Sequence, residues 1–220
     1  MRGQFHCRFS PNLFFLRKRA SKRPCWMIAV LVLTGLLASC ATPLPTTPVD
    51  QNPAWTARQK ELARLTRWET AGRIGVVNGQ DGWHAHFQWV QQNAEYRIDL
   101  IGPLGQGRVL VQSDGREVNL QTQDGQRWTA PDPDALLEQA LGVRLPVGGL
   151  RYWVRGLPAP GPAAPQVDAD GRLIRLEQNG WVIEYPAYAP TSVFNLDLPE
   201  RIVARRQDLS VKLVIEQWMP

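Results

Sequence analysis

The sequence predicts a mainly β domain with helices, in which a strongly curved antiparallel sheet forms an open half-barrel whose mouth the helices cover. Segments with strand-like alternation lie on both sides of a helical insert, and turn signals such as Asp124-Gly125 and Asn179-Gly180 separate several of them. Eight of the nine tryptophans follow residue 40. So many large apolar side chains would suit a curved sheet whose concave face is either filled by its own side chains or leaves room for an apolar ligand.

Residues 1–39 predict a cleaved signal peptide of the lipoprotein type. A basic run precedes "WMIAVLVLTGLLA" (26–38), an apolar stretch that is too short for a spanning helix. The stretch runs into "LASC" (37–40), which resembles the lipobox of bacterial lipoproteins and predicts cleavage before Cys40 and acylation of that cysteine. The alternatives are a signal whose cysteine is incidental and an uncleaved anchor. In many Gram-negative lipoproteins an aspartate directly after the lipidated cysteine marks retention in the inner membrane. Here Ala41 stands at that position, which predicts an outer-membrane location.

Charge and cysteine content argue against a nucleic-acid-binding protein and against a disulfide-stabilised protein. Seven of the 25 basic residues and none of the 20 acidic residues precede residue 40, so 18 basic and 20 acidic residues follow it. The basic pI therefore belongs to the signal peptide, and we expect no nucleic-acid partner. Because Cys7 and Cys25 would leave with the signal, the exported chain has no disulfide and must rely on its core.

The exported chain begins with a tether and a helix. Residues 40–54 hold the cysteine to be lipidated and a proline-rich segment that predicts an extended tether. Residues 55–220 are expected to form one domain. At its start, apolar residues at helical spacing predict an amphipathic helix over 55–68.

The next part of the chain has the period of β-strands. In "GWHAHFQW" (82–89) and "EYRIDLIG" (95–102), every second residue is apolar, so each strand presents one apolar and one polar face. Alternations near Ile74, Val109 and Val118 continue the pattern and predict a meander of antiparallel strands.

A helical insert interrupts the strands. "DPDALLEQALG" (132–142) has a capping aspartate, a proline at the first helical position and a terminal glycine. A second, shorter helix is expected within 148–156, and 157–165 is expected to be a loop. Further strands are predicted at 172–178, 181–188, 201–206 and 210–218.

The residues offer no catalytic site, so we expect no enzyme activity and no cofactor. No serine of the exported chain stands in a G-x-S-x-G motif, and no cysteine remains to act as a nucleophile. His84 and His86 share a strand face, but the exported chain has no third histidine, and its one cysteine, Cys40, would be lipidated, so we expect no metal site. Asp132 with Asp134, and Asp168 with Asp170, fall at a helix cap and a turn, where aspartate is common.

Several motifs occur together in this chain: the lipobox, Trp68 with "GRIGV", "HFQW", "YRIDLIGPLGQG", "LPVGGLRYWVRGLP", "DGRL" and "KLVIEQW". In this order they resemble the LolB family of outer-membrane lipoprotein receptors in Gram-negative bacteria. The resemblance implies a LolA/LolB-like half-barrel whose helices form a lid over an apolar cavity. It also implies a receptor, anchored through Cys40 and facing the periplasm, that takes lipoproteins from the carrier LolA and inserts them into the outer membrane.

The resemblance also gives "IGPLGQG" (101–107) a role. In the family the leucine of the "PLG" turn protrudes and is needed for insertion; here it is Leu104, between Pro103 and Gly105. We expect a type I turn with Leu104 at its third position, where no positive φ is required. From the residues alone, a leucine that folds back onto the sheet or is merely exposed is the simpler interpretation. The candidate residues lining the acyl cavity are Ile74, Val76, Phe87, Trp89, Tyr96, Ile98, Leu100, Val109 and Val111.

The expected partners are a LolA-type carrier, the acyl chains of client lipoproteins and the outer-membrane bilayer, with the protein itself a monomer. Two other functions would explain part of the sequence. A soluble lipid carrier of the same fold would need the cavity but not the lipobox cysteine. A structural outer-membrane lipoprotein that scaffolds an envelope assembly machine would need the anchor but not the cavity.

Overall fold

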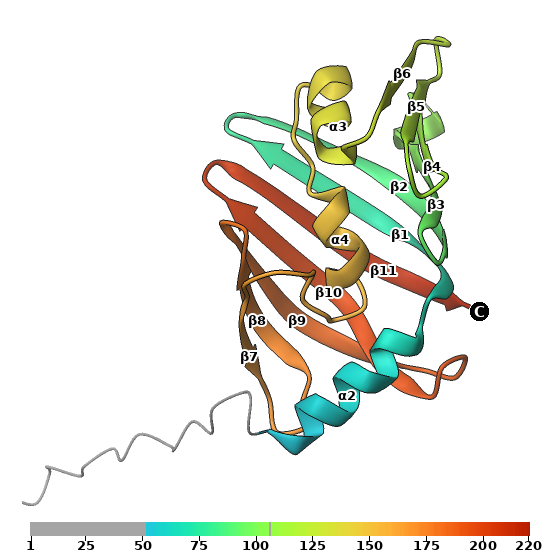
Figure 1. The fold of residues 1–220 in the computed structure, drawn as a ribbon. Helices are drawn as coiled ribbons and strands as arrows, with labels where there is room; N and C mark the ends of the chain where they lie inside the picture. Colours follow the sequence, from blue (N-terminus) through green and yellow to red (C-terminus); the bar gives the residue numbers. More distant parts are fainter. Residues whose placement is uncertain (1–51, 106) are drawn as a thin grey trace, which may run out of the picture. The chain divides into compact units, whose positions relative to one another are not determined.

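The strands before and after the helical insert form one continuous sheet. The computed structural model describes residues 52–105 and 107–220; the predicted signal peptide, Cys40 and nearly all of the tether lie outside them. Eleven antiparallel strands follow the order β6-β5-β4-β3-β2-β1-β11-β10-β9-β8-β7 (Figure 1). Their bounds are β1 Arg67–Asn78, β2 Asp81–Gln92, β3 Glu95–Ile101, β4 Arg108–Ser113, β5 Val118–Thr122, β6 Arg127–Ala130, β7 Ala164–Val167, β8 Leu173–Gln178, β9 Trp181–Thr191, β10 Leu196–Arg206 and β11 Leu209–Met219.

The topology explains why helices cover the sheet. The two edge strands are β6 and β7, and the segment between them carries α3 (Pro133–Leu141) and α4 (Val147–Trp153). This connection from one edge of the sheet to the other crosses the concave side, where Figure 1 shows both helices. Leu137 of α3 and Trp153 of α4 are buried in the core, and the Trp153 ring centroid lies 6.1 Å from that of Trp181 in β9. The predicted half-barrel with covering helices is confirmed.

The first helix, α2 (Pro53–Arg64), is shorter than predicted at its C-terminal end. Asn52 caps it by accepting a hydrogen bond from the backbone N–H of Trp55, and Leu65 has left the helical conformation. The expectation that the helix continues to Trp68 is wrong. Trp68 lies in β1 opposite Gln91 of β2, because backbone pairing across the sheet overrides the local helical spacing.

Three strands, β7, β9 and β10, include proline-containing segments that the sequence pattern does not predict as strands. The segment expected to be a loop at 157–165 already enters β7 at Ala164, and Pro165 is tolerated because β7 is an edge strand. β9 and β10 are longer than predicted although they contain prolines, and the register between them shifts around Pro199. The sequence pattern does not predict β6, since four residues are too few for a clear alternation.

Candidate functional site

Eight of the nine candidate cavity residues lie buried on one face of neighbouring strands. They occupy β1 to β4, and the register places Phe87 opposite Leu100, and Trp89 opposite Ile98. The ninth, Val109, is half-buried and packs against the same core. The structure therefore brings all nine candidates together: Ile74, Val76, Phe87, Trp89, Tyr96, Ile98, Leu100, Val109 and Val111. That a cavity opens among them stays a prediction, since they belong to one packed cluster with the cover helices.

Aromatic rings line one end of this concave face. The ring centroid of Trp68 lies 5.3 Å from that of Trp89 and 5.5 Å from that of Trp218, and Trp89 lies 6.4 Å from Tyr96. Burial raises the pKa of the Tyr96 phenol to about 12, so this side chain is neutral at physiological pH. The rings form a large apolar surface that carries few polar groups.

A few polar contacts hold the cover helices in place. The Asp134 carboxylate of α3 accepts a hydrogen bond of 3.0 Å from the backbone N–H of Gly148 in α4, and burial raises the pKa of Asp134. The indole Nε1 of Trp153 donates to Gln178 of β8 at 2.9 Å, and the Gln178 amide donates to the Ala159 carbonyl at 2.7 Å. Asp132 caps α3 as predicted.

The loop between β3 and β4 presents a bare leucine to solvent. Leu104 lies in the short 3₁₀ turn η2 (Pro103–Gly105), and 99% of its surface is exposed. The prediction of a type I turn is wrong, because Leu104 has φ 57° and ψ 22°, in the left-handed region. An L-residue with a Cβ adopts that region only at a cost of about 1–2 kcal/mol. The strain and the exposure together indicate that Leu104 is not placed by packing.

The base of this loop is closed by backbone and side-chain contacts. The N–H of Gly102 donates to the Gly107 carbonyl at 2.9 Å. Beside it, Arg108 at the start of β4 makes an ion pair with Asp99 of β3. Leu104 is thus carried by a closed hairpin end.

A pocket of about 520 Å³ lies where the C-terminal end of α2 meets β1, the β2–β3 turn and α4. We call it the α2–α4 pocket. None of the nine candidate cavity residues lines it. Its walls are Gln59, Ala63, Leu65, Thr66, Trp68, Gln91, Asn93, Arg151, Tyr152, Arg155, Leu157 and Pro158.

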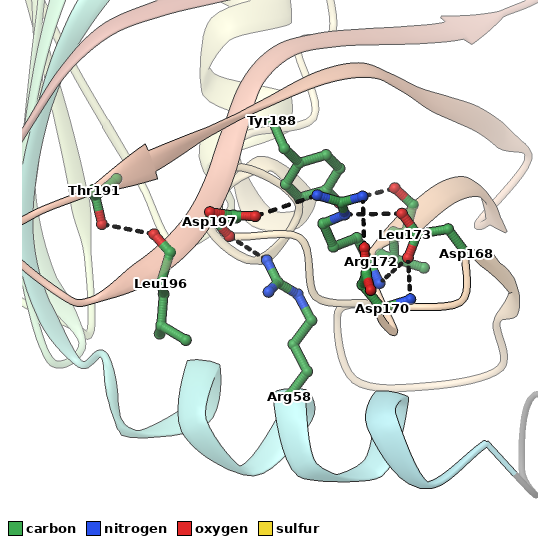
Figure 2. A network of polar contacts seen from close by, with 9 residues as sticks. All are labelled: Arg58, Asp168, Asp170, Arg172, Leu173, Tyr188, Thr191, Leu196 and Asp197. Atoms are coloured by element: carbon green, nitrogen blue, oxygen red, sulfur yellow. Dashed lines mark hydrogen bonds and ion pairs between the residues drawn. The ribbon is translucent and has the colours of Figure 1, made fainter.

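A polar network fixes α2 against the later strands (Figure 2). Arg58 of α2 donates to the backbone carbonyl of Asp197 in β10. Arg172 bonds the carboxylates of Asp168, Asp170 and Asp197 at 2.8, 3.0 and 3.2 Å. Both guanidiniums lie over the ring of Tyr188, at 5.5 and 5.6 Å from its centroid. Burial raises the pKa of Tyr188 and lowers that of Arg58. The contacts of Arg58 with Asp197 and Tyr188 hold α2 against β9 and β10.

The chain matches known proteins over most of its length. The family described as "Outer membrane lipoprotein LolB" matches residues 66–218. The outer-membrane lipoprotein LolB of Pseudomonas paraeruginosa (strain DSM 24068 / PA7) is 42% identical over 167 residues, covering 76% of this chain and 80% of that protein. Those of Stutzerimonas stutzeri (strain A1501) and Ectopseudomonas mendocina (strain ymp) are 39% and 38% identical, covering 86% and 88% of this chain and 92% and 96% of theirs. The chain belongs to the LolB family of outer-membrane lipoproteins.

The LolB match spans the complete sheet apart from the last residue of β11, and it includes both cover helices. Among solved structures, a DUF1329 family protein from Desulfovibrio piger ATCC 29098 is similar with a TM-score of 0.48 and 8% identity, covering 79% of this chain and 93% of that one. Within residues 52–105 and 107–220, no helix combines the length and apolar character needed to cross a bilayer.

The motifs that carry the LolB resemblance lie at the Leu104 loop and at the α2–α4 pocket. "GPLG" forms the loop that exposes Leu104, and "RGLP" supplies Arg155, Leu157 and Pro158 to the α2–α4 pocket. His84 and His86 lie on the exposed face of β2, as the alternation predicts.

Sequence reasoning missed several buried polar and charged residues near the candidate site. Asp99 lies on the predicted polar face of β3 yet is buried under its arginine partners. Gln178 and Arg58 are also buried, although nothing in their local pattern distinguishes them from surface residues. Arg155 is buried as well, and it alone could have been singled out from the sequence, because it belongs to the "RGLP" motif of the family resemblance.

Proposed function

We propose that the protein is a lipid-anchored receptor on the periplasmic side of the outer membrane, which accepts lipoproteins from a LolA-type carrier and inserts them into the bilayer. The observation that carries the proposal is Leu104, a fully exposed leucine held by a closed loop on a LolB-family chain. Moving one leucine from water into lipid is worth about 1.5–3 kcal/mol. That is too little to anchor a protein, but it is enough to bias the loop toward the membrane.

The mechanism requires no covalent step. Acyl chains of a client would leave the carrier, pass over the apolar face of β1 to β4 under the cover helices, and partition into the bilayer. Each buried methylene contributes about 0.8 kcal/mol. Direction would then follow from graded affinity, weakest in the carrier and strongest in the membrane. The small number of polar contacts on α3 and α4 supports a cover that can shift to admit chains.

Reconstituted transfer tests the proposal. The intact protein is placed in liposomes, and a LolA-type carrier loaded with a fluorescent lipoprotein is added outside. Membrane-bound client, measured by flotation, should accumulate faster than with empty liposomes, and the client should displace a fluorescent fatty acid from the protein. Equal rates with and without the protein, together with no saturable binding of the fatty acid, would favour the structural scaffold instead.

A further inference from the structure

Two arginines line the α2–α4 pocket close together. The guanidinium carbon of Arg151 lies 5.2 Å from the ring centroid of Tyr152, and that of Arg155 lies 5.6 Å from the same centroid. The side chain of Tyr152 therefore supports both cations, and no aspartate or glutamate of the described chain lines the pocket with them. Clustered cations without carboxylates favour an anionic ligand.

Arg155 is buried and bonded only to neutral acceptors. It is 8% exposed, and its Nη1 donates to the carbonyls of Leu62 and Leu65 at 3.2 and 2.8 Å, while its Nε donates to the Arg151 carbonyl at 3.2 Å. These bonds satisfy the C-terminal carbonyls of α2 but leave the charge without a counter-ion in the part of the chain that the structure describes. Burial and the neighbouring Arg151 lower the pKa of Arg155. A buried charge of this kind is stabilised by any anion that enters the pocket.

Arg151 is free to contribute directly. It is half-buried, and among residues 52–105 and 107–220 its side chain has no hydrogen-bond or ion-pair partner. Its guanidinium contacts only the ring of Tyr152 in its own helix, so its charge can be removed without breaking a hydrogen bond or an ion pair between elements of the described chain.

The same pocket has an apolar wall. Trp68, which is 2% exposed, contributes its ring to this wall. Leu65, Leu157 and Pro158 extend this wall, and Trp68 connects it to the aromatic rings of the concave face. A ligand for the pocket therefore needs acceptor oxygens and an apolar portion, and about 520 Å³ falls within the range of small-molecule sites.

We propose that the α2–α4 pocket binds an anionic amphiphile, with its carboxylate or phosphodiester on Arg151 and Arg155 and its acyl chain against Trp68. A fatty acid and an anionic phospholipid share this chemistry. The site is additional to the handling of client acyl chains and does not rest on that function, because the argument uses only the charges and walls of this pocket.

Binding to the intact protein in neutral detergent micelles tests the proposal without a carrier or client. With ¹⁵N-labelled arginine, the Nε–H signals of Arg151 and Arg155 are followed by NMR during titration with octanoate, dihexanoylphosphatidylglycerol, 1-octanol or inorganic phosphate. Both anionic amphiphiles, or one of them, should shift the two signals saturably, and the tighter of the two identifies the preferred anion. Neutral 1-octanol and phosphate alone should bind more weakly by about tenfold or more, the loss expected when charge-assisted hydrogen bonds or apolar burial are absent.

Variants separate recognition from folding. Arg151→Gln should weaken binding of the anionic amphiphile by about tenfold or more, while the melting temperature stays unchanged. Arg151→Lys should retain most of the affinity. Arg116→Gln, at an exposed turn outside the pocket, is the charge-matched control and should bind like the wild type. Equal affinity for octanoate and 1-octanol, equal affinity for phosphate and the phospholipid, or unchanged binding in Arg151→Gln would overturn the proposal.

Discussion

Arg108 donates two parallel hydrogen bonds to the carboxylate of Asp99 at the base of the loop that exposes Leu104. Its Nε lies 2.7 Å from Oδ1 and its Nη2 donates to Oδ2, while Arg97 adds a longer contact of 3.5 Å. Asp99 and Arg108 lie on adjoining strands, β3 and β4. The ion pair therefore cross-links the two strands just before they enter the loop.

This pair predicts an acid-dependent contribution to stability. The hydrogen bond from Arg108 lowers the pKa of Asp99, against the opposing effect of burial. A carboxyl with a lowered pKa stabilises the fold above its unfolded value of about 3.9, and this contribution is lost as the pH falls through the folded pKa. Asp99→Asn should lower the free energy of unfolding by about 1 kcal/mol at pH 7, a modest value because Arg108 is half exposed.

Urea denaturation between pH 2 and pH 7 measures this effect. The difference between wild type and Asp99→Asn should shrink below about pH 4. Asp81→Asn, at an exposed aspartate without an ion pair in the described residues, is the control and should change little. A constant difference down to pH 2 would contradict the assignment.

A substitution at the exposed Leu104 should affect the delivery of clients but not the stability of the fold. Leu104→Glu should leave the free energy of unfolding within about 0.5 kcal/mol of the wild type, because the side chain packs against nothing. Acceptance of clients from the carrier should continue, but delivery to liposomes should fail, since a carboxylate does not enter the apolar layer. A clearly lower melting temperature would mean that Leu104 is part of the core.

The left-handed backbone of Leu104 makes a second substitution informative. Leu104→Gly removes the strain at φ 57° and should raise the free energy of unfolding by up to about 1 kcal/mol. Delivery should nevertheless be lost with the side chain. A stabilised protein that still delivers clients at the wild-type rate would show that the loop, and not the leucine, acts on the membrane.

The lipobox predicts the chemistry of the N-terminus. The mature protein should begin at Cys40 and carry three acyl chains, and it should fractionate with the outer membrane. Mass spectrometry of the native N-terminal peptide checks the modification, with Cys40→Ala as the unlipidated control. A mature chain that starts upstream of Cys40 and carries no lipid would disprove the anchor.

Two adjacent glycines of α4 offer a matched pair of packing variants. A Cβ at Gly149 would lie 2.7 Å from the ring of buried Trp153, whereas the nearest atom to a Cβ at Gly148 is 3.7 Å away. Gly149→Ala should destabilise by about 1–3 kcal/mol through overpacking. Gly148→Ala should be neutral or stabilise by up to about 1 kcal/mol through helix propensity. Thermal denaturation of both variants checks the prediction, which a well-tolerated Gly149→Ala would contradict.

Local pattern alone determines much of the fold. The alternation in β2 places Phe87 and Trp89 on one apolar face, and the alternation in β3 does the same for Ile98 and Leu100, since a period of two residues sends alternate side chains to opposite faces. Asp132 and Gly142 bound α3, because capping depends on a few neighbouring residues. The family resemblance likewise rests on short motifs that the chain carries in order.

Only the tertiary structure decided the elements whose state depends on distant partners. Trp68 belongs to a strand because Gln91 pairs with it, against the helical spacing of its own segment. Leu104 adopts a left-handed conformation instead of the type I turn that Pro103 suggested, in a loop closed by Gly102, Gly107 and the Asp99–Arg108 pair. Arg151 and Arg155 share a pocket with Trp68 because the connection between the two sheet edges brings α4 to the C-terminal end of α2 and to β1. Such contacts join residues far apart in the chain, and no local period or spacing encodes them.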